Sequence, residues 1–329
     1  MSAAWEVHYR KGVWLPQAGW WLDAQARAER SFVSHAHSDH IARHKEVICT
    51  PATARFLHAR LPGRRTVTEV PFGRPHSLEF GLTATLHPAG HILGSAQILL
   101  EHESHGSLLY TGDFKLRSGL AAEKCATPRA DVLIMETTFG LPRYVFPPDE
   151  DSIAKLVDFC ATALAEGATP ALLCYSLGKS QEVLRALASA NLPVMLHADT
   201  LRLTRIYEQL GVTFPSHREF DAREVAGHVV ICPPHANGLL SRIPAVRTAV
   251  ITGWAIDSSA IYRMRCHAAF PLSDHAGFDD LLRFVELVQP KRVLTLHGFA
   301  REFAQTLRAR GVDALALGHG NQLEFTLPH

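Results

Sequence analysis

The pattern of hydrophobic and polar positions divides the chain into three stretches. Up to about residue 145, short apolar runs alternate with turns, which is typical of strands. From there to residue 266, strand-like and helix-like segments alternate, and this favours a parallel sheet covered by helices. The remaining residues resume the earlier pattern, in which strands run into polar residues. We therefore expect an α/β protein in which a second α/β domain, residues 146–266, is inserted between residues 1–145 and residues 267–329.

Individual elements follow from the same pattern, because period-2 alternation indicates strands and 3.6-residue periodicity indicates helices. Helices are expected at residues 51–61, 152–166, 180–190, 200–210, 276–288 and 300–310. Strands are expected at residues 30–34, 67–70, 78–86, 107–110, 132–135, 171–175, 193–197, 229–232, 249–252, 292–296 and 314–317. The aromatic pair Trp20 and Trp21 is expected to pack beneath the loop that follows the first of these strands.

The densest chemistry lies directly after residue 33, where residues 34–40 read Ser-His-Ala-His-Ser-Asp-His. Imidazole nitrogen and carboxylate oxygen suit a divalent ion such as zinc or manganese. Four ligands on so short a loop do not close one tetrahedron comfortably, so the spacing predicts two adjacent ions. His35 and His37 would bind one ion, and Asp39 and His40 the other. The alternative is a histidine-rich surface loop, since the chain has 20 histidines.

A two-metal site requires further ligands, and three candidates stand at turns or strand ends downstream. Asp113 follows Thr-Gly and is the candidate carboxylate that bridges both ions. His91 would complete the first set of ligands and His297 the second. Taken alone, Asp113 could be an ordinary turn aspartate, and either histidine could be structural.

Two more residues are candidates for proton transfer. Glu136 ends a predicted strand, and His275 follows Ser-Asp before a predicted helix. If the two meet, the carboxylate would raise the pKa of His275 and hold its tautomer, so that the ring could protonate a leaving oxygen. A surface acid and a turn histidine are the alternatives. We place Glu136, His275 and the ligand Asp39 in the catalytic set.

A candidate phosphate site lies between a predicted strand and helix of the inserted domain. Ser176 and Lys179 could bind a phosphate next to the scissile one through hydroxyl, ammonium and helix N-terminus. The alternative for Lys179 is a solvated residue at the helix start.

Composition narrows the class of protein. The chain has 329 residues, a formal net charge of +1 and six widely spaced cysteines without a Cys-x-x-Cys pair. This argues against a disulfide or zinc-cysteine framework, and for a reducing compartment. No signal-like segment or apolar run long enough to cross a membrane is apparent, so we expect a cytoplasmic protein without a membrane partner. Any nucleic acid would be held by a local groove and by metal ions.

Together these motifs resemble, in order, those of metallo-β-lactamase-fold nucleases with a β-CASP insertion. The matching runs are His35-Ala-His37-Ser-Asp39-His40, Gly-His91, Thr-Gly-Asp113, Glu136-Thr-Thr, Ser-Asp-His275 and Leu-His297-Gly. The resemblance implies an α/β fold: an αββα sandwich with an inserted β-CASP α/β domain. It implies a two-metal phosphodiester hydrolase with two divalent ions, zinc in the usual case and manganese in some members. In this resemblance Asp113 contacts both ions, and Glu136 and His275 act together at the leaving group.

Longer runs resemble one branch, the bacterial ligase-associated DNA exonucleases. They include Tyr175-Ser-Leu-Gly-Lys-Ser-Gln and Thr252-Gly-Trp. The expected function is a DNA exonuclease in repair, with DNA favoured over RNA and a DNA ligase or helicase as possible partners. The alternative is an RNA-processing exo- or endoribonuclease of the same family, and a small-molecule hydrolase on this fold is a third reading. The chain departs from the branch at His235 and after Trp254, both at positions that could face substrate.

Overall fold

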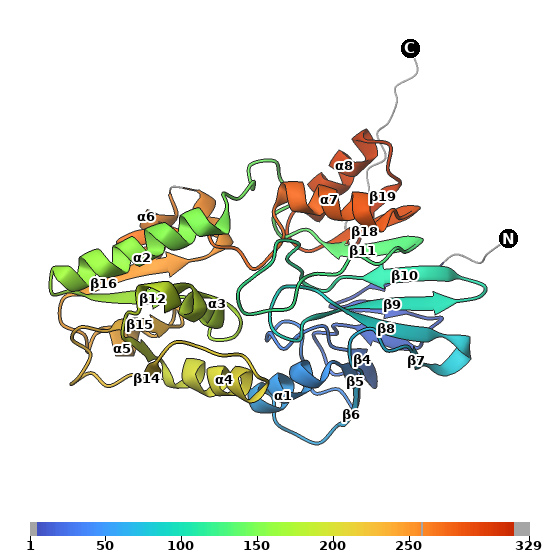
Figure 1. Cartoon of the computed structure of the whole chain (residues 1–329). Helices are drawn as coiled ribbons and strands as arrows, with labels where there is room; N and C mark the ends of the chain where they lie inside the picture. The colour runs from blue at the N-terminus through green and yellow to red at the C-terminus, as the bar shows by residue number, and fades with distance from the viewer. Residues whose placement is uncertain (1–4, 258, 319–329) are drawn as a thin grey trace, which may run out of the picture.

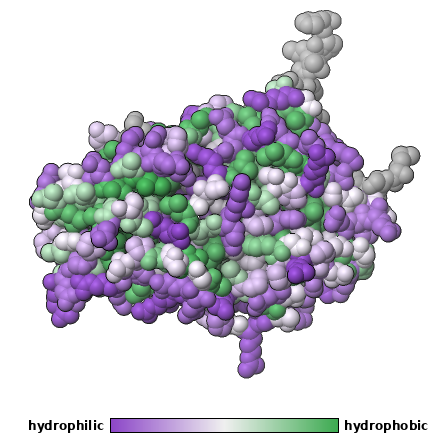
Figure 2. All heavy atoms as spheres, viewed as in Figure 1, coloured by the Kyte–Doolittle hydropathy of each residue, from purple (hydrophilic) through white to green (hydrophobic). Residues whose placement is uncertain are grey.

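The chain folds into three β-sheets, two of which face each other while the third stands beside them (Figure 1). The computed structural model describes residues 5–257 and 259–318. The facing sheets form the right half of Figure 1 and the third sheet forms the left half. Figure 2 shows apolar side chains gathered over α2 and hydrophilic ones along the lower rim of the same face.

The first sheet is built from the N-terminal strands in the order β1-β2-β3-β4-β5-β6. Its strands are β1 His8–Tyr9, β2 Val13–Leu15, β3 Trp20–Leu22, β4 Arg30–Phe32, β5 Glu46–Cys49 and β6 Thr66–Glu69. β1 to β3 pair in antiparallel fashion and β3 to β6 in parallel. Helix α1, Pro51–Arg60, begins with the Thr50 side chain accepting a hydrogen bond from Thr53 N. This capping oxygen and the proline in the first turn set the start of the helix, as predicted.

The second sheet has the order β19-β18-β11-β10-β9-β8-β7, so strands from the C-terminal part complete a sheet begun by the N-terminal part. Its strands are β7 His76–Ser77, β8 Thr83–Pro88, β9 Ala96–His102, β10 Gly106–Tyr110, β11 Val132–Glu136, β18 Arg292–Leu296 and β19 Ala314–Ala316. Helices α7, Phe278–Val288, and α8, Ala300–Ala309, cover its outer face.

Two hydrophobic cores hold these layers together. The core between the sheets joins Leu15 and Leu22 to Leu100 and Leu108. The core beneath the outer helices packs residues such as Phe284 against β11 and β18. Because α1 covers the other sheet through Leu57, the order of layers is helix, sheet, sheet, helix. The predicted αββα sandwich is therefore confirmed.

The third sheet is all parallel, in the order β14-β13-β15-β12-β16-β17. Its strands are β12 Thr169–Leu173, β13 Val194–Leu196, β14 His217–Glu219, β15 Val229–Cys232, β16 Val246–Ile251 and β17 Ala268–Phe270. Its helices are α2 Asp149–Ala165, α3 Lys179–Ala186, α4 Ala198–Gln209, α5 Asn237–Leu240 and α6 Ala260–Met264. Hydrophobic clusters lie on both faces, as in an α/β domain covered on two sides. The predicted domain limits at residues 146 and 266 stay a prediction.

The strand predicted at residues 78–86 is partly wrong. The chain forms a 3-10 turn at Glu79–Gly81 between β7 and β8. Phe80 and Gly81 there have positive φ angles of 62° and 73°, which strand geometry does not allow. The strand begins only at Thr83. Elsewhere Trp20 is buried within β3, as expected of a packing residue, and all six cysteines are buried and free.

No helix in the described part of the chain is long and apolar enough to cross a membrane.

Candidate functional site

The predicted ligands meet where three loops of the sandwich converge. The loop after β4 carries His35 and His37, the turn after β8 carries His91, and the turn after β10 carries Asp113. One ligand atom from each of these residues lies within 4.8 Å of the others. His35 Nε2 is 3.0 Å from His37 Nδ1, which is 3.1 Å from His91 Nε2. Segments up to 78 residues apart in the sequence therefore present their polar atoms to one point.

In each histidine, one ring nitrogen faces the centre of the cluster and the other faces away from it. The partner of the nitrogen that faces away shows whether the inner nitrogen carries a lone pair. His91 Nδ1 lies 2.8 Å from the carbonyl oxygen of Asp274, to which it donates. His37 Nε2 lies 3.1 Å from the carbonyl oxygen of Leu177 and donates likewise. A neutral imidazole has one N–H, so the inner nitrogen of each ring is an acceptor. Lone pairs that face each other with no proton between them are what a cation site requires.

Asp23 fixes the other two histidines of the first motif. Its carboxylate accepts from His40 Nδ1 at 2.9 Å, from Tyr110 Oη at 2.8 Å and from Ser34 Oγ at 2.6 Å. Ser34 Oγ therefore accepts from His35 Nδ1, which is 2.9 Å away. The inner Nε2 atoms of His35 and His40 are left facing the centre. The donor set thus fits a metal ion on the chemistry of its atoms.

A second group of ligands is more open. His40 Nε2 lies 3.3 Å from Asp113 Oδ2 and 3.8 Å from Asp39 Oδ2. Asp113 Oδ2 also lies 3.6 Å from His35 Nε2, so this carboxylate stands between the two groups. Its bridging role stays a prediction. The ring of His297 is 6.0 Å from that of His40. Asp39 is largely exposed, with 71% of its side chain accessible.

Burial and neighbouring charge set the protonation of the cluster. Burial, together with nearby histidines, lowers the pKa of His35 and His91 and brings that of His37 to about 3. These rings are neutral at pH 7 and able to bind a cation. Burial opposes charge on Asp113 as well, but His40 holds the pKa of this carboxyl well below its usual value.

Glu136 and His275 do meet. Glu136 is buried at the end of β11, where its carboxylate accepts from the backbone N of Thr138 at 2.8 Å. Its Oε1 lies 2.9 Å from His275 Nδ1. Burial acts against a charged ring, but the Glu136 carboxylate and the other nearby acids raise the pKa of His275 to about 10. One ligand atom each from Asp113, Glu136 and His275 lies within 4.8 Å of the others, so this pair adjoins the cluster.

The structure corrects the expectation for Lys179. Its side chain is only 2% exposed and does not face the cleft. Its Nζ donates to the carbonyl oxygen of Leu272 at 2.8 Å and pairs with Asp274 Oδ1 at 3.3 Å. A buried ammonium with these partners is not free for phosphate. Ser176, by contrast, lines the cleft.

The cleft is a cavity of about 580 Å³ with candidate ligands of the sandwich on one side and the inserted domain on the other. His40, Asp113, His275 and His297 line it from the sandwich. Residues of the inserted domain complete it, among them Tyr175, His235 and Trp254. Arg60, at the end of α1, also lines it.

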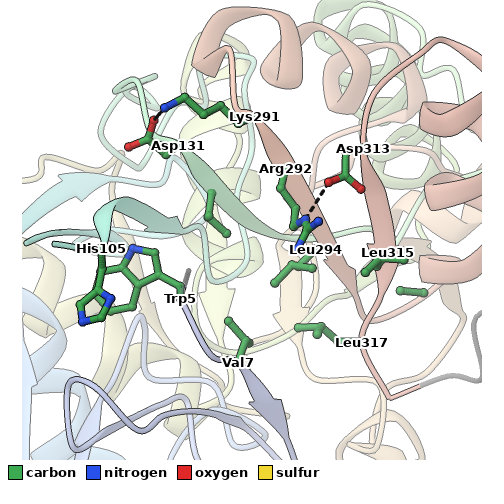
Figure 3. Close-up of a pocket in the computed structure, with 12 residues that line it drawn as sticks. Trp5, Val7, His105, Asp131, Lys291, Arg292, Leu294, Asp313, Leu315 and Leu317 are labelled. Carbon is green, nitrogen blue, oxygen red and sulfur yellow. Dashed lines mark hydrogen bonds and ion pairs between the residues drawn. The ribbon is translucent and has the colours of Figure 1, made fainter. Parts of the chain in front are cut away.

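A second cavity, of about 560 Å³, lies at an edge of the sandwich (Figure 3). Its walls are mostly apolar, with Trp5, Val7 and Leu317 among them. The charged groups at its rim pair with each other, Lys291 with Asp131 at 2.6 Å and Arg292 with Asp313 at 2.7 Å. No cluster of possible metal ligands was found among its described lining residues. The histidine-lined cleft is therefore the candidate active site.

Sequence reasoning missed Asp23. It is buried and follows β3 directly, with a φ of 49°. The signal was present, because an acid at the end of an apolar strand also marks Glu136. It was overlooked because the short Trp-Trp-Leu run looked like packing alone.

Comparison with known proteins gives a matching family model and several relatives. A family model described as the Zn-dependent metallo-hydrolase RNA specificity domain matches residues 261–317. A protein of Opitutus terrae named probable DNA ligase is 59% identical over 323 residues, covering 98% of this chain and 32% of that protein. The 5' exonuclease Apollo of Rattus norvegicus is 27% identical over 307 residues, covering 87% of this chain and 54% of Apollo.

More distant likenesses agree with the fold. The DNA cross-link repair 1A protein of Mus musculus is 23% identical over 319 residues, covering 85% of this chain and 30% of that protein. The chain thus spans about a third to a half of the length of these curated relatives. A crystal structure of a protein of unknown function from Enterococcus faecalis V583 superposes with a TM-score of 0.58 at 12% identity, covering 90% of this chain and 79% of that one.

Proposed function

We propose that this chain is a member of the metallo-β-lactamase-fold nucleases that carry a β-CASP domain, and that it is a metal-dependent DNA exonuclease acting in repair. One observation carries the proposal: convergent imidazole lone pairs and Asp113 adjoin the Glu136–His275 pair within one cleft. The relatives named 5' exonuclease Apollo and DNA cross-link repair 1A support a DNA substrate over RNA.

We infer that two divalent ions bind here, zinc in the first instance and manganese as the alternative. His35, His37 and His91 would hold one ion, Asp39, His40 and His297 the other, and Asp113 both. The tight first group supports this assignment more directly than the open second group. When bound, such ions supply Lewis-acid stabilisation of charge that builds up on the phosphate and lower the pKa of water.

The protein's own groups then act on the leaving oxygen. Glu136 orients His275 through Nδ1, and the pKa of about 10 keeps a proton on the ring at neutral pH. In the proposed reaction His275 gives a proton to the departing sugar oxygen, as a general acid does. The Ser176 hydroxyl is proposed to contact a flanking phosphate. Lys179 acts only through Asp274, whose carbonyl oxygen orients His91.

A DNA ligase is the proposed partner in the pathway. The relative named probable DNA ligase matches 98% of this chain within about a third of its own length. Removal of nucleotides before strand sealing would place the two activities in succession. A helicase partner stays a prediction from the sequence.

The test is digestion of matched end-labelled single-stranded DNA and RNA with added zinc or manganese. Wild type is compared with His37→Ala and His275→Ala, and with His58→Ala as a control, because His58 is an exposed histidine outside the cleft. We expect stepwise shortening of DNA by wild type and the control. His275→Ala should slow it by about 10²–10⁴-fold, the range for loss of a general acid.

Preferential cleavage of RNA would transfer the assignment to RNA processing. Intact DNA and RNA with both metals would contradict the nuclease assignment altogether. Equal rates for His275→Ala and the control would leave a nuclease but remove the proposed general acid.

A further inference from the structure

Trp254 is a large apolar side chain left partly open at the mouth of the cleft. It is 39% exposed and lines the cavity. Its other surface is held by packing, with ring centroids 4.8 Å from Phe139 and 5.6 Å from Tyr144. Phe139 in turn lies 6.1 Å from the ring of His275. A chain of aromatic contacts therefore connects Trp254 to the proposed proton donor.

The backbone around Trp254 is fixed as well. The 3-10 turn Gly253–Ile256 begins with the Thr252 side chain accepting from Trp254 N at 3.4 Å. A Cβ on Gly253 would lie 2.5 Å from Phe139 Cζ, so only glycine allows this close approach. The indole is thus presented in one orientation before any substrate arrives, which lowers the entropy cost of binding.

Tyr175 lines the same cavity from the segment after β12 and is 66% exposed. Its carbonyl oxygen accepts from Ser180 Oγ at 2.8 Å, so the backbone is held while the ring is free. Two aromatic rings that both line one cleft and keep exposed surface are candidates for contact with a ligand. Arg60, which lines the same cavity, supplies a cation for the backbone of a nucleic acid.

We propose that Tyr175 and Trp254 form a base-stacking platform that receives the unpaired end of a single strand, an inference that rests on the proposed nuclease function. Proteins that hold single strands combine a basic groove with aromatic rings on which bases stack. Here the net charge is only +1, so long-range attraction to phosphate is weak, and stacking would add to the affinity from the local groove. A cavity of about 580 Å³ lies in the range of small-ligand pockets, which suits a few nucleotides and not a duplex.

The test measures binding of competitor thymidine oligonucleotides by the metal-loaded protein in a His275→Ala background, which limits turnover. Each competitor is compared with versions that lack the bases of the two terminal nucleotides at one end or the other. We expect loss of bases at one end to weaken binding by on the order of tenfold. Trp254→Ala should weaken binding of the intact strand by a similar factor, and base removal should then have no further effect. Trp254→Phe should keep the affinity of wild type and its loss on base removal.

Tyr175→Ala is the second variant, because an exposed ring contributes little to folding. Tyr262→Ala is the matched control, since Tyr262 is 84% exposed and lies outside the cleft. Equal binding of intact and base-free oligonucleotides would overturn the stacking platform, and so would equal losses of binding in Tyr262→Ala and Trp254→Ala. If wild type still shortens DNA in either case, the proposed function is retained. Absence of both binding and shortening would instead overturn the proposed function.

Discussion

Asp23 shows how one buried carboxylate can organise several functional groups. It accepts hydrogen bonds from Ser34 N at 2.7 Å and from Ser34 Oγ, His40 and Tyr110. Every one of these partners is a donor, so an anionic acceptor suits the position. Through them Asp23 sets the tautomers of His35 and His40 without facing the centre itself.

Asp23→Asn should therefore weaken metal binding while leaving every ligand in place. The amide NH₂ would face donors, and the hold on His40 would be lost. Loss of such an outer partner costs about 10–100-fold in metal affinity. The measurement is a zinc titration against a chelating indicator, followed by metal analysis of the dialysed protein.

Tyr110→Phe is the control, because it removes one donor to the same carboxylate and leaves the bond to His40. Its zinc affinity should stay within about threefold of wild type, since the histidine tautomers are unchanged. Equal affinities of Asp23→Asn and wild type would show that Asp23 does not support the ligands.

Among the elements, the strands and helices with regular periodicity were predicted well, whereas a turn with special backbone geometry was not. The strands at 229–232 and 292–296 and the helix after Thr50 lie where the sequence predicts them. The turn at Glu79–Gly81 interrupts a strand-like run, because Phe80 takes a left-handed φ that its apolar character does not signal. The strands Ala96–His102 and Ala268–Phe270 were not predicted, since their register is set by neighbours distant in sequence.

The start of α3 also shows a long-range contact that helix propensity does not predict. Lys179 looked like a solvated or phosphate-binding residue, yet it is buried against Asp274 from the C-terminal part of the sandwich. A lysine enters such a position only with a partner, and that partner lies 95 residues away. The ion pair connects the inserted domain to the segment that orients His91.

Lys179→Met should destabilise the protein by on the order of 3 kcal/mol, because it leaves the half-buried Asp274 carboxylate without its cation. The thermal unfolding midpoint should fall by several degrees. Lys155→Met on α2 is the matched control, because Lys155 is exposed and its loss should change the midpoint little. A midpoint equal to that of the control would mean that the pair contributes nothing to stability.

Across the whole molecule, the sequence predicted the layers, but it did not predict which residues of the inserted domain line the cleft. Each candidate ligand stands in a local motif, so its chemistry could be proposed from its neighbours. The cleft depends on how the inserted domain packs against the sandwich, which no local pattern encodes. Arg60, His235 and Trp254 therefore acquired a location only in the folded chain. The same packing buries Lys179 against Asp274, so that its side chain does not face the predicted phosphate site.

Because the proposed ligands come from both the N-terminal and the C-terminal part of the chain, metal binding should stabilise the sandwich as a unit. His35 to Asp113 belong to the N-terminal part and His297 to the C-terminal part, and β11 pairs directly with β18 between them.

A ligand that binds only the folded state at 100 times its Kd adds about 2.7 kcal/mol to the free energy of unfolding. Removing zinc with a chelator should therefore lower the unfolding midpoint by several degrees. Tryptophan fluorescence measures unfolding of the sandwich, since it contains Trp5, Trp14, Trp20 and Trp21. His297→Ala, which removes the one proposed ligand from the C-terminal part, should show a smaller shift with chelator than wild type. A wild type indifferent to chelator would contradict a metal shared by the two parts.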